Sequence, residues 1–232
     1  MEGPAIQPQA RFALYYAPAE DDALWRCGND WLGRDARSNE RRAQPELVGI
    51  EELTAEPRLY GFHATLKPPM RLRDGTSHAA FLEATASVAA GVPQFDLPPL
   101  RVANLHGFLA LREAEPSPAL QALADACVAG VDEFRAPPSE AELARRRRNG
   151  LPRAQEEMLV RWGYPYVFAT WFFHITLTRR LSAEEHERVR PAAERFFAPA
   201  LRIPRRVRDL CVFTQPEPGA PFALTERIPL SP

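Results

Sequence analysis

The pattern His-x-Thr-Leu occurs twice in this 232-residue chain, in "GFHATLKPP" from Gly61 and in "FFHITLTRR" from Phe172. Each copy lies in an apolar run of the kind that forms a β-strand. After each copy the sequence predicts a short loop, a helix that begins at Ser77 or Ser182, and a pair of strands. A chain that repeats this order is predicted to be an α+β protein in which two similar units face each other across a cleft.

The repeat predicts one bilobal domain over residues 1–232. The first lobe is expected to centre on residues 60–115 and the second on residues 166–230. A Pro- and Arg-rich stretch over about 135–163 has no counterpart in the first half and is predicted to be a helical insertion. A strand is expected over residues 11–17, and residues 19–59, which contain several glycines, are expected to be irregular.

Side chains alternate between the two faces of a β-strand, so each motif is predicted to present a polar face and an apolar face. The polar faces are expected to carry His63, Thr65 and Lys67 in the first copy and His174, Thr176 and Thr178 in the second. The residues between them are apolar and are predicted to pack into the core of each lobe. A single buried histidine is more often structural than catalytic, but two copies with the same alternation favour a functional pair.

The residue types on these faces favour acid–base chemistry on a phosphate group. Two imidazoles, each with a pKa near ~6.5, can supply one base and one acid around neutral pH. Threonine hydroxyls can donate to phosphate oxygens, and Lys67 is expected to add positive charge. No carboxylate shares either face and no third ligand stands at zinc-binding spacing, so neither a metal nor another cofactor is expected. The sequence contains neither a Gly-x-Ser-x-Gly motif nor a Gly-rich phosphate loop.

Composition limits the partners that the chain is expected to have. The formal net charge is −1, so any attraction for anions must be local, and neither nucleic acid nor a membrane surface is favoured. Three widely spaced cysteines do not indicate a disulfide framework, and no apolar run approaches the ~18–20 residues of a membrane span. With no signal peptide visible, the expected location is the cytoplasm. The sequence does not indicate an oligomeric state.

Paired His-x-Thr or His-x-Ser motifs about half a chain apart are typical of the 2H phosphoesterase superfamily, which this chain resembles. The stretches "YGFHATLKPP", "ARRRR", "RWGYPY" and "FHITLT" resemble more closely a bacterial branch associated with phosphonate metabolism. The resemblance implies a bilobal α+β fold with pseudo-twofold symmetry and metal-independent hydrolysis of a cyclic phosphodiester. It assigns His63 and His174 as the catalytic pair and Thr65 and Thr176 as ligands of the phosphate oxygens.

Three further interpretations concern substrate choice. Lys67 stands where many relatives carry an apolar residue, with Thr178 at the equivalent place, and these two residues are expected to tune the substrate. Arg145–Arg148 spread around most of a helix at about 100° per residue, so only one or two can face the cleft. The hypothesis is that Arg146 or Arg148 binds a second, non-reacting phosphate, such as that of a ribosyl intermediate of phosphonate breakdown. The alternative is a solvated helix face.

Three classes of function remain open at this stage. The favoured one is a cyclic phosphodiesterase that acts on a small sugar or nucleotide phosphate ester. The second is an enzyme that processes the 2′,3′-cyclic ends of RNA or joins RNA ends, against which the near-neutral charge and the lack of a basic, aromatic-rich stripe both count. The third is a non-catalytic module that holds a phosphorylated ligand in the cleft.

Overall fold

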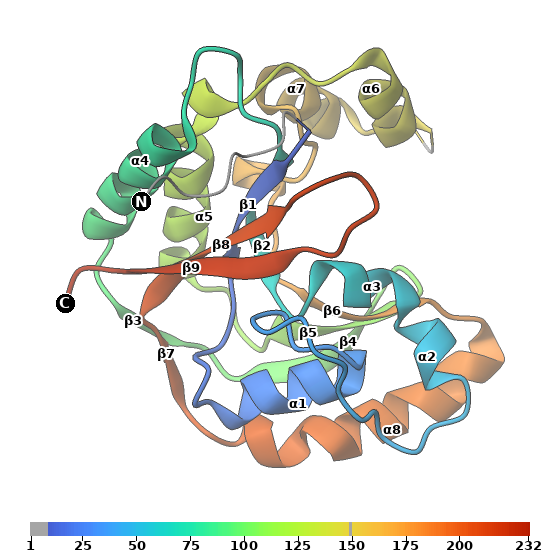
Figure 1. Cartoon of the computed structure of the whole chain (residues 1–232). Helices are drawn as coiled ribbons and strands as arrows, with labels where there is room; N and C mark the ends of the chain where they lie inside the picture. Colours follow the sequence, from blue (N-terminus) through green and yellow to red (C-terminus); the bar gives the residue numbers. More distant parts are fainter. Residues whose placement is uncertain (1–8, 149) are drawn as a thin grey trace.

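Seven strands form an antiparallel sheet in this computed structural model, which describes residues 9–148 and 150–232 of the chain. From one edge to the other its strands are β4 (Leu100–Leu105), β5 (Phe108–Glu113), β6 (Ile175–Arg180), β2 (Ala64–Met70), β1 (Arg11–Tyr16), β8 (Asp209–Gln215) and β9 (Ala223–Pro229) (Figure 1). A second, two-stranded sheet pairs β3 (Phe95–Leu97) with β7 (Arg205–Val207). The α+β class expected from the sequence is confirmed.

The helices of the described residues are α1 (Ala23–Leu32), α2 (Ile50–Leu53), α3 (Ala55–Tyr60), α4 (His78–Ala90), α5 (Pro118–Gly130), α6 (Glu140–Arg147), α7 (Arg153–Trp162) and α8 (Ala183–Leu201). Serine caps begin α4 and α8 as predicted. The Ser77 side chain accepts from the Ala80 amide, and Ser182 forms a reciprocal capping box with Glu185. Such a cap typically contributes about 1 kcal/mol to the stability of a helix.

The prediction that residues 19–59 are irregular is wrong, because α1, α2 and α3 lie there. In α1 the buried residues Leu24, Gly28, Trp31 and Leu32 follow helical spacing. Gly28 leaves room for the ring of Phe62, since a β-carbon at this position would lie 2.2 Å from that ring. The glycine that counted against a helix in the sequence is thus a packing requirement of the first motif.

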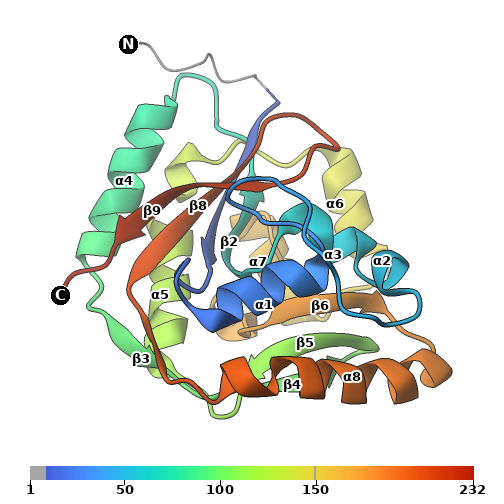
Figure 2. The same ribbon diagram turned by 60° about the horizontal axis from the view of Figure 1, so that its bottom comes forward.

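The helices divide between two lobes of the sheet (Figures 1 and 2). Helices α4 and α5 lie over the part formed by β2, β1, β8 and β9, while α1 and α8 lie over β4, β5 and β6. Helices α6 and α7 lie within residues 135–163, the stretch predicted to be a helical insertion. Among the described residues, no helix is both long enough and apolar enough to cross a membrane.

A pseudo-twofold relation between the halves follows from the strand order. When α2 and α3 in the first half and α6 and α7 in the second are set aside, the succession β1, α1, β2, α4, β3, β4 is matched by β5, α5, β6, α8, β7, β8. Strand β2 lies beside β6 at the centre of the sheet. The lobes are therefore not the contiguous segments 60–115 and 166–230 that were expected. Strands β4 and β5 lie with β6, and strands β8 and β9 lie with β1 and β2. The two matched units begin at β1 and at β5, ahead of the motif strands β2 and β6. A unit that is taken to begin at the motif therefore assigns the strands that follow it to the wrong lobe.

The motif strands carry the core of the molecule on one face. Phe62, Ala64 and Leu66 are at most 1% exposed, and their counterparts in the second copy, Phe173, Ile175 and Leu177, are fully buried. Burying a large apolar side chain contributes about 1.5–3 kcal/mol, so the apolar half of each motif holds its strand firmly in place. The alternation predicted for both motifs is thus present up to Leu66 and up to Leu177.

A β-bulge in β2 breaks the alternation after Leu66. Tyr15 of β1 pairs with Thr65 and Leu14 pairs with Lys67, so β1 advances one residue while β2 advances two. The extra residue turns Lys67 toward the core side that Leu14 occupies, where it is 1% exposed. The expectation that Lys67 shares the polar face of His63 and Thr65 is therefore wrong.

Candidate active site

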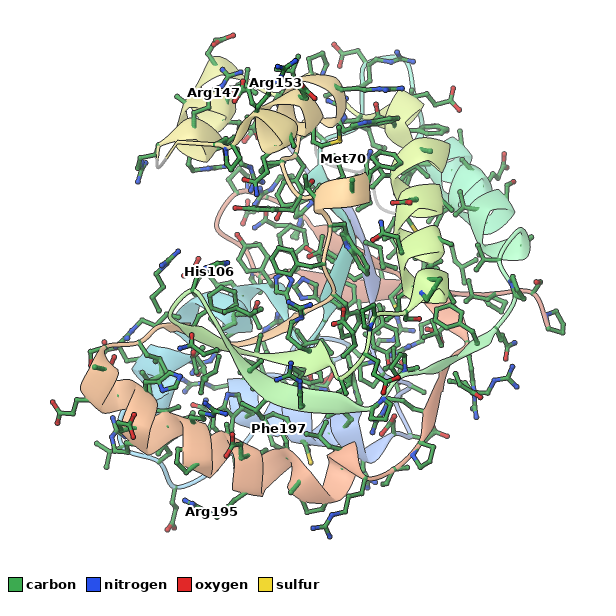
Figure 3. The ribbon with its side chains drawn as sticks, turned by 180° about the vertical axis from the view of Figure 1, so that it is seen from behind. Met70, His106, Arg147, Arg153, Arg195 and Phe197 are labelled. Carbon is green, nitrogen blue, oxygen red and sulfur yellow. The ribbon has the colours of Figure 1, made fainter. Side chains whose placement is uncertain are left out.

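A cavity of about 560 Å³ opens between the two lobes and the α6–α7 insertion. Its wall contains residues from β1, β2, β5, β6, α3 and α6 and from the loops before β2 and after α7. Among them are Arg11, Tyr15, Glu56, Tyr60, His63, Thr65, Pro69, Phe108, Arg145, Arg146, Tyr164, Thr176, Thr178, Arg179 and Arg180. In Figure 3 the insertion, which carries the labelled Arg147 and Arg153, stands on one side of this region and the β4–β5 turn with His106 stands on the other. The volume suits a small organic ligand.

The central strand pair brings the two motifs together. Ala64 pairs with Ile175, and extending this antiparallel register by one residue sets His63 opposite Thr176 and Thr65 opposite His174. Directly opposed side chains share a face of the sheet. The two histidines are then diagonal neighbours on adjacent strands, for which the typical separation of the backbone positions is about 7–8 Å. The two rings are near enough for His174 to affect the pKa of His63 electrostatically.

The two histidines differ in how they meet the cavity. His63 and both motif threonines line the wall, whereas His174 is absent from the described residues that form it. The His174 ring stacks on Phe172 with centroids 4.8 Å apart and meets the edge of Phe108 at 6.1 Å. The ring of His63 stacks on Tyr15 with centroids 3.6 Å apart. Aromatic contacts therefore fix the plane of each imidazole.

Matched hydrogen bonds define the tautomer of both rings. The Nδ1 atom of His63 lies 3.0 Å from the Gly61 carbonyl oxygen, and that of His174 lies 3.2 Å from the Phe172 carbonyl oxygen. A carbonyl oxygen only accepts, so each Nδ1 carries the proton and donates it. In the neutral ring Nε2 then holds a free lone pair, which in His63 accepts a hydrogen bond from the Thr65 hydroxyl at 3.2 Å.

Burial keeps both rings neutral in the free protein. Burial lowers the pKa of His63 to about 3, although the bond to the Gly61 carbonyl opposes the change, and His174 nearby lowers it further. Burial also lowers the pKa of His174. The hydrogen bond to the Phe172 carbonyl opposes this change, and the positive charge of Arg112 lowers the pKa further. An anion bound between the rings would favour the charged form of one of them and raise its pKa.

The turn before the first motif requires a glycine. Gly61 has φ 81° and ψ 177°, a combination that is essentially restricted to glycine. A β-carbon there would also lie 2.8 Å from the Ala36 side chain. This turn aims the Gly61 carbonyl at His63, so the glycine contributes directly to the orientation of the imidazole.

The remaining residues predicted for the site lie in different surroundings. Lys67 donates to the Asp132 carboxylate at 2.6 Å and to the Val128 carbonyl at 3.1 Å, so it holds α5 and the segment after it to β2. Thr178 lines the cavity, but its hydroxyl already accepts the Leu109 amide at 3.0 Å.

Of the two arginines proposed to bind a second phosphate, only Arg146 lies in the wall. Arg148 is exposed, caps the end of α6 and is not among the described residues that line the cavity. Arg145 lines the cavity in its place, and Arg147 pairs with Glu156 at 2.6 Å.

Several residues of the wall were not found from the sequence. Arg11 and Tyr15 lie on one face of β1 by simple alternation, and they reach the site because β1 pairs with β2. Their strand was recognised, but nothing local indicated its neighbour. Tyr164 follows the end of α7, next to Pro165, and lines the cavity.

The wall is strongly cationic although the chain is not. It contains five arginines (Arg11, Arg145, Arg146, Arg179 and Arg180) against one carboxylate, that of Glu56. The chain as a whole has a formal net charge of −1. With a net charge near zero, any attraction for anions must come from a local group of positive charges, and this cavity has such a group. Among the described residues, no group of three or more His, Cys, Asp or Glu side chains is arranged to hold a metal ion.

Comparison with known proteins gives relatives of two kinds. The chain is 39% identical over 97% of its length to a ribose 1,5-bisphosphate phosphokinase PhnN of Janthinobacterium sp. (strain Marseille), and 37% identical over 92% to that of Laribacter hongkongensis (strain HLHK9). It covers 52% and 50% of those proteins, so it spans about half the length of these curated relatives.

Solved structures of phosphoesterases are also similar to this chain. A phosphoesterase structure matches 97% of the chain and 100% of its own length at 13% identity, with a TM-score of 0.45. Escherichia coli LigT in complex with 3′-AMP matches 97% of the chain and 100% of its own length at 14% identity, with a TM-score of 0.46.

The proteins similar to this chain are thus named as ribose 1,5-bisphosphate phosphokinases and as phosphoesterases. A family model matches residues 65–223, which include the second motif and the threonine of the first. The chain therefore belongs to the family described as "Protein of unknown function (DUF1045)".

Proposed function

We propose that this protein is a metal-independent phosphodiesterase that hydrolyses a small cyclic phosphate, with His63 and His174 as its acid–base pair. The observation that carries the proposal is the matched setting of the two rings. Each imidazole precedes a central strand, donates from Nδ1 to a carbonyl two residues earlier, and has a threonine two residues later on the same face. Each ring held in this way keeps a basic Nε2 atom, and the proposal requires both atoms to reach the same bound phosphate.

The proposed reaction needs one base and one acid. The Nε2 atom of one histidine takes a proton from water as the water oxygen bonds to phosphorus. The other histidine, protonated once the anionic substrate has raised its pKa, gives its proton to the ester oxygen as the P–O bond breaks. The net change is the addition of one water. Thr65 and Thr176 donate to the nonbridging oxygens, where charge accumulates in the transition state.

A sugar phosphate is the substrate class that we favour. Curated relatives that are about twice as long are named as ribose 1,5-bisphosphate phosphokinases, whose substrate is a sugar carrying two phosphates. Opening a cyclic phosphate on a ribose that already carries a phosphate yields a compound of this class. We therefore place the reaction in phosphonate metabolism, as a step that supplies a ribose phosphate. The free cysteines Cys27, Cys127 and Cys211 fit a cytoplasmic location.

RNA with a 2′,3′-cyclic end is the second candidate. The cationic wall also contains Tyr15, Tyr60 and Tyr164, and arginine together with aromatic side chains is a combination that binds nucleotides. The two candidates share their reaction chemistry and differ in the size of the group that carries the phosphate.

A substrate panel in the presence of a chelator tests the proposal. Ribose cyclic phosphates, 2′,3′-cyclic nucleotides and a short RNA with a 2′,3′-cyclic end are incubated with the protein in EDTA, and products are followed by ³¹P NMR. Hydrolysis of a small cyclic phosphate in EDTA is the expected result. Hydrolysis of the RNA alone favours the second candidate. Loss of activity in EDTA with recovery on added zinc or manganese overturns the acid–base assignment, and phosphate binding without turnover of any compound indicates a binding module.

A further inference from the structure

In the part of the chain that the structure describes, four arginines of the cavity wall lack a carboxylate partner. One of them, Arg180, donates to the His106 carbonyl oxygen at 2.7 Å, and the other three lie outside the reaction centre. Among the described residues, no Asp or Glu oxygen lies within 4.0 Å of the guanidinium nitrogens of Arg11, Arg145 or Arg146, whereas Arg179, in the same wall, pairs with Glu52 and Glu185. A guanidinium without an anionic partner, in a cavity, is a binding site for an anionic ligand.

Contacts with other side chains hold two of these arginines, Arg11 and Arg146, in place. The Arg146 guanidinium carbon stands 4.4 Å from the centre of the Tyr164 ring, and that of Arg11 stands 5.4 Å from the centre of the Phe222 ring. Arg11 also donates through Nε to the Gln215 side chain at 2.6 Å, which leaves its terminal nitrogens available. A cation stacked on a ring loses little further freedom when it binds a ligand, so Arg11 and Arg146 are pre-organised.

The group lies at a definite distance from the reaction centre. Arg11 and Tyr15 share a face of β1, and the Tyr15 ring is the one that stacks on His63. Four residues of extended strand separate them by about 13 Å, and the length of the arginine side chain shortens this gap. A second, smaller cavity is also bordered by Arg11, Arg145 and Arg146, so the three arginines stand where the two cavities meet.

We propose that Arg11, Arg145 and Arg146 form a subsite for a second, non-reacting phosphate monoester of the substrate, with Tyr164 holding Arg146 in position. This inference rests on the proposed function and narrows the substrate to a cyclic phosphate on a sugar that carries another phosphate. The separation from His63 requires a sugar between the two phosphates. The subsite favours a compound with two phosphates over one with a single phosphate. Only a compound with two phosphates can place one at the histidines and the other against the arginines.

The test compares adenosine 2′,3′-cyclic phosphate with the same compound carrying a 5′-phosphate. Arg146→Ala is expected to lower kcat/KM for the 5′-phosphorylated compound by about 10- to 100-fold, mostly through KM, as losing a charge-assisted hydrogen bond does. The same variant should change kcat/KM for the other compound less than twofold. Arg148→Ala is the matched control, since Arg148 follows the same helix and is exposed outside the wall. Equal losses for both compounds, or no loss for either, overturn the subsite.

Binding distinguishes failure of the subsite from failure of the proposed function. Ribose 5-phosphate is titrated calorimetrically into the wild type, Arg146→Ala, Arg11→Ala and Arg148→Ala. The subsite requires that the first two substitutions weaken binding at least tenfold and that Arg148→Ala does not. If this pattern holds while neither cyclic compound is hydrolysed, the subsite stands and the proposed function fails. If hydrolysis proceeds and ribose 5-phosphate binds all four proteins alike, the subsite fails alone.

Discussion

The ion pair between Lys67 and Asp132 allows a sharp test of how β2 is built. The Lys67 side chain is 1% exposed, and its ammonium lies 2.6 Å from the Asp132 carboxylate and 3.1 Å from the Val128 carbonyl oxygen. Replacing Asp132 with alanine leaves a buried ammonium with the carbonyl group as its remaining partner. The protein is then expected to be much less stable.

The size of the effect follows from the different costs of removing either partner. Removing one member of a buried pair typically costs about 3–5 kcal/mol, which is the loss expected for Asp132→Ala. Lys67→Met removes the buried charge itself, and Asp132 keeps two hydrogen bonds from Arg135, at 2.8 and 3.0 Å. We expect this substitution to cost about 1 kcal/mol or less. The double variant should therefore be more stable than Asp132→Ala alone.

The free energy of unfolding is measured by urea unfolding, followed by circular dichroism, for the wild type, Asp132→Ala, Lys67→Met and the double variant. A free energy of unfolding for Asp132→Ala within about 0.5 kcal/mol of the wild type would refute the reasoning. So would a double variant no more stable than Asp132→Ala. A raised KM for a cyclic phosphate in Lys67→Met, without a loss of stability, would show instead that Lys67 reaches the substrate.

Three further predictions concern the surroundings of His63. Burial lowers the pKa of His63 to about 3 and also lowers that of His174, so below about pH 6.5 the unfolded chain binds more protons than the folded one. The free energy of unfolding should fall between pH 7 and pH 5, by up to about 2 kcal/mol for His63, and His63→Asn should reduce this fall; a pH-independent value contradicts the burial. Nitrogen-15 NMR of the neutral rings should show the proton on Nδ1 in both histidines, and a proton on Nε2 would contradict the bonds to the carbonyl groups. Gly61→Ala should cost about 1–3 kcal/mol and reduce turnover, because the backbone at Gly61 is strained for any side chain; an unchanged melting temperature would show that the turn adapts.

Local patterns predicted the parts of the site that depend on one strand or one helix. Alternation along the strand correctly buried Phe62 and Phe173 and left the neighbouring histidine on the other face. Serine at helix starts gave the beginnings of α4 and α8 because the cap interacts with the backbone three residues later. Both signals lie within a few residues, so no knowledge of the rest of the fold was needed.

The parts that were missed depend on contacts between distant segments. Lys67 was placed on the wrong face because a bulge, set by pairing with β1, shifts the alternation by one residue. Arg11 and Tyr15 could not be assigned to the site without knowing that β1 lies beside β2. Gly28 lowered the helical signal of α1, since the ring that requires it belongs to Phe62, far along the chain.

Turnover by single histidine variants tests the central claim most directly. Hydrolysis of the best cyclic phosphate from the panel is measured in EDTA for the wild type, His63→Asn, His174→Asn and the control His106→Asn. His106 lies on the β4–β5 turn with φ 51°, a conformation that asparagine tolerates. The account predicts that each motif substitution lowers kcat by about 10²–10⁴-fold while the control retains wild-type activity. Activity that survives in either motif variant, with the fold intact, would contradict the assignment of the two histidines as acid and base.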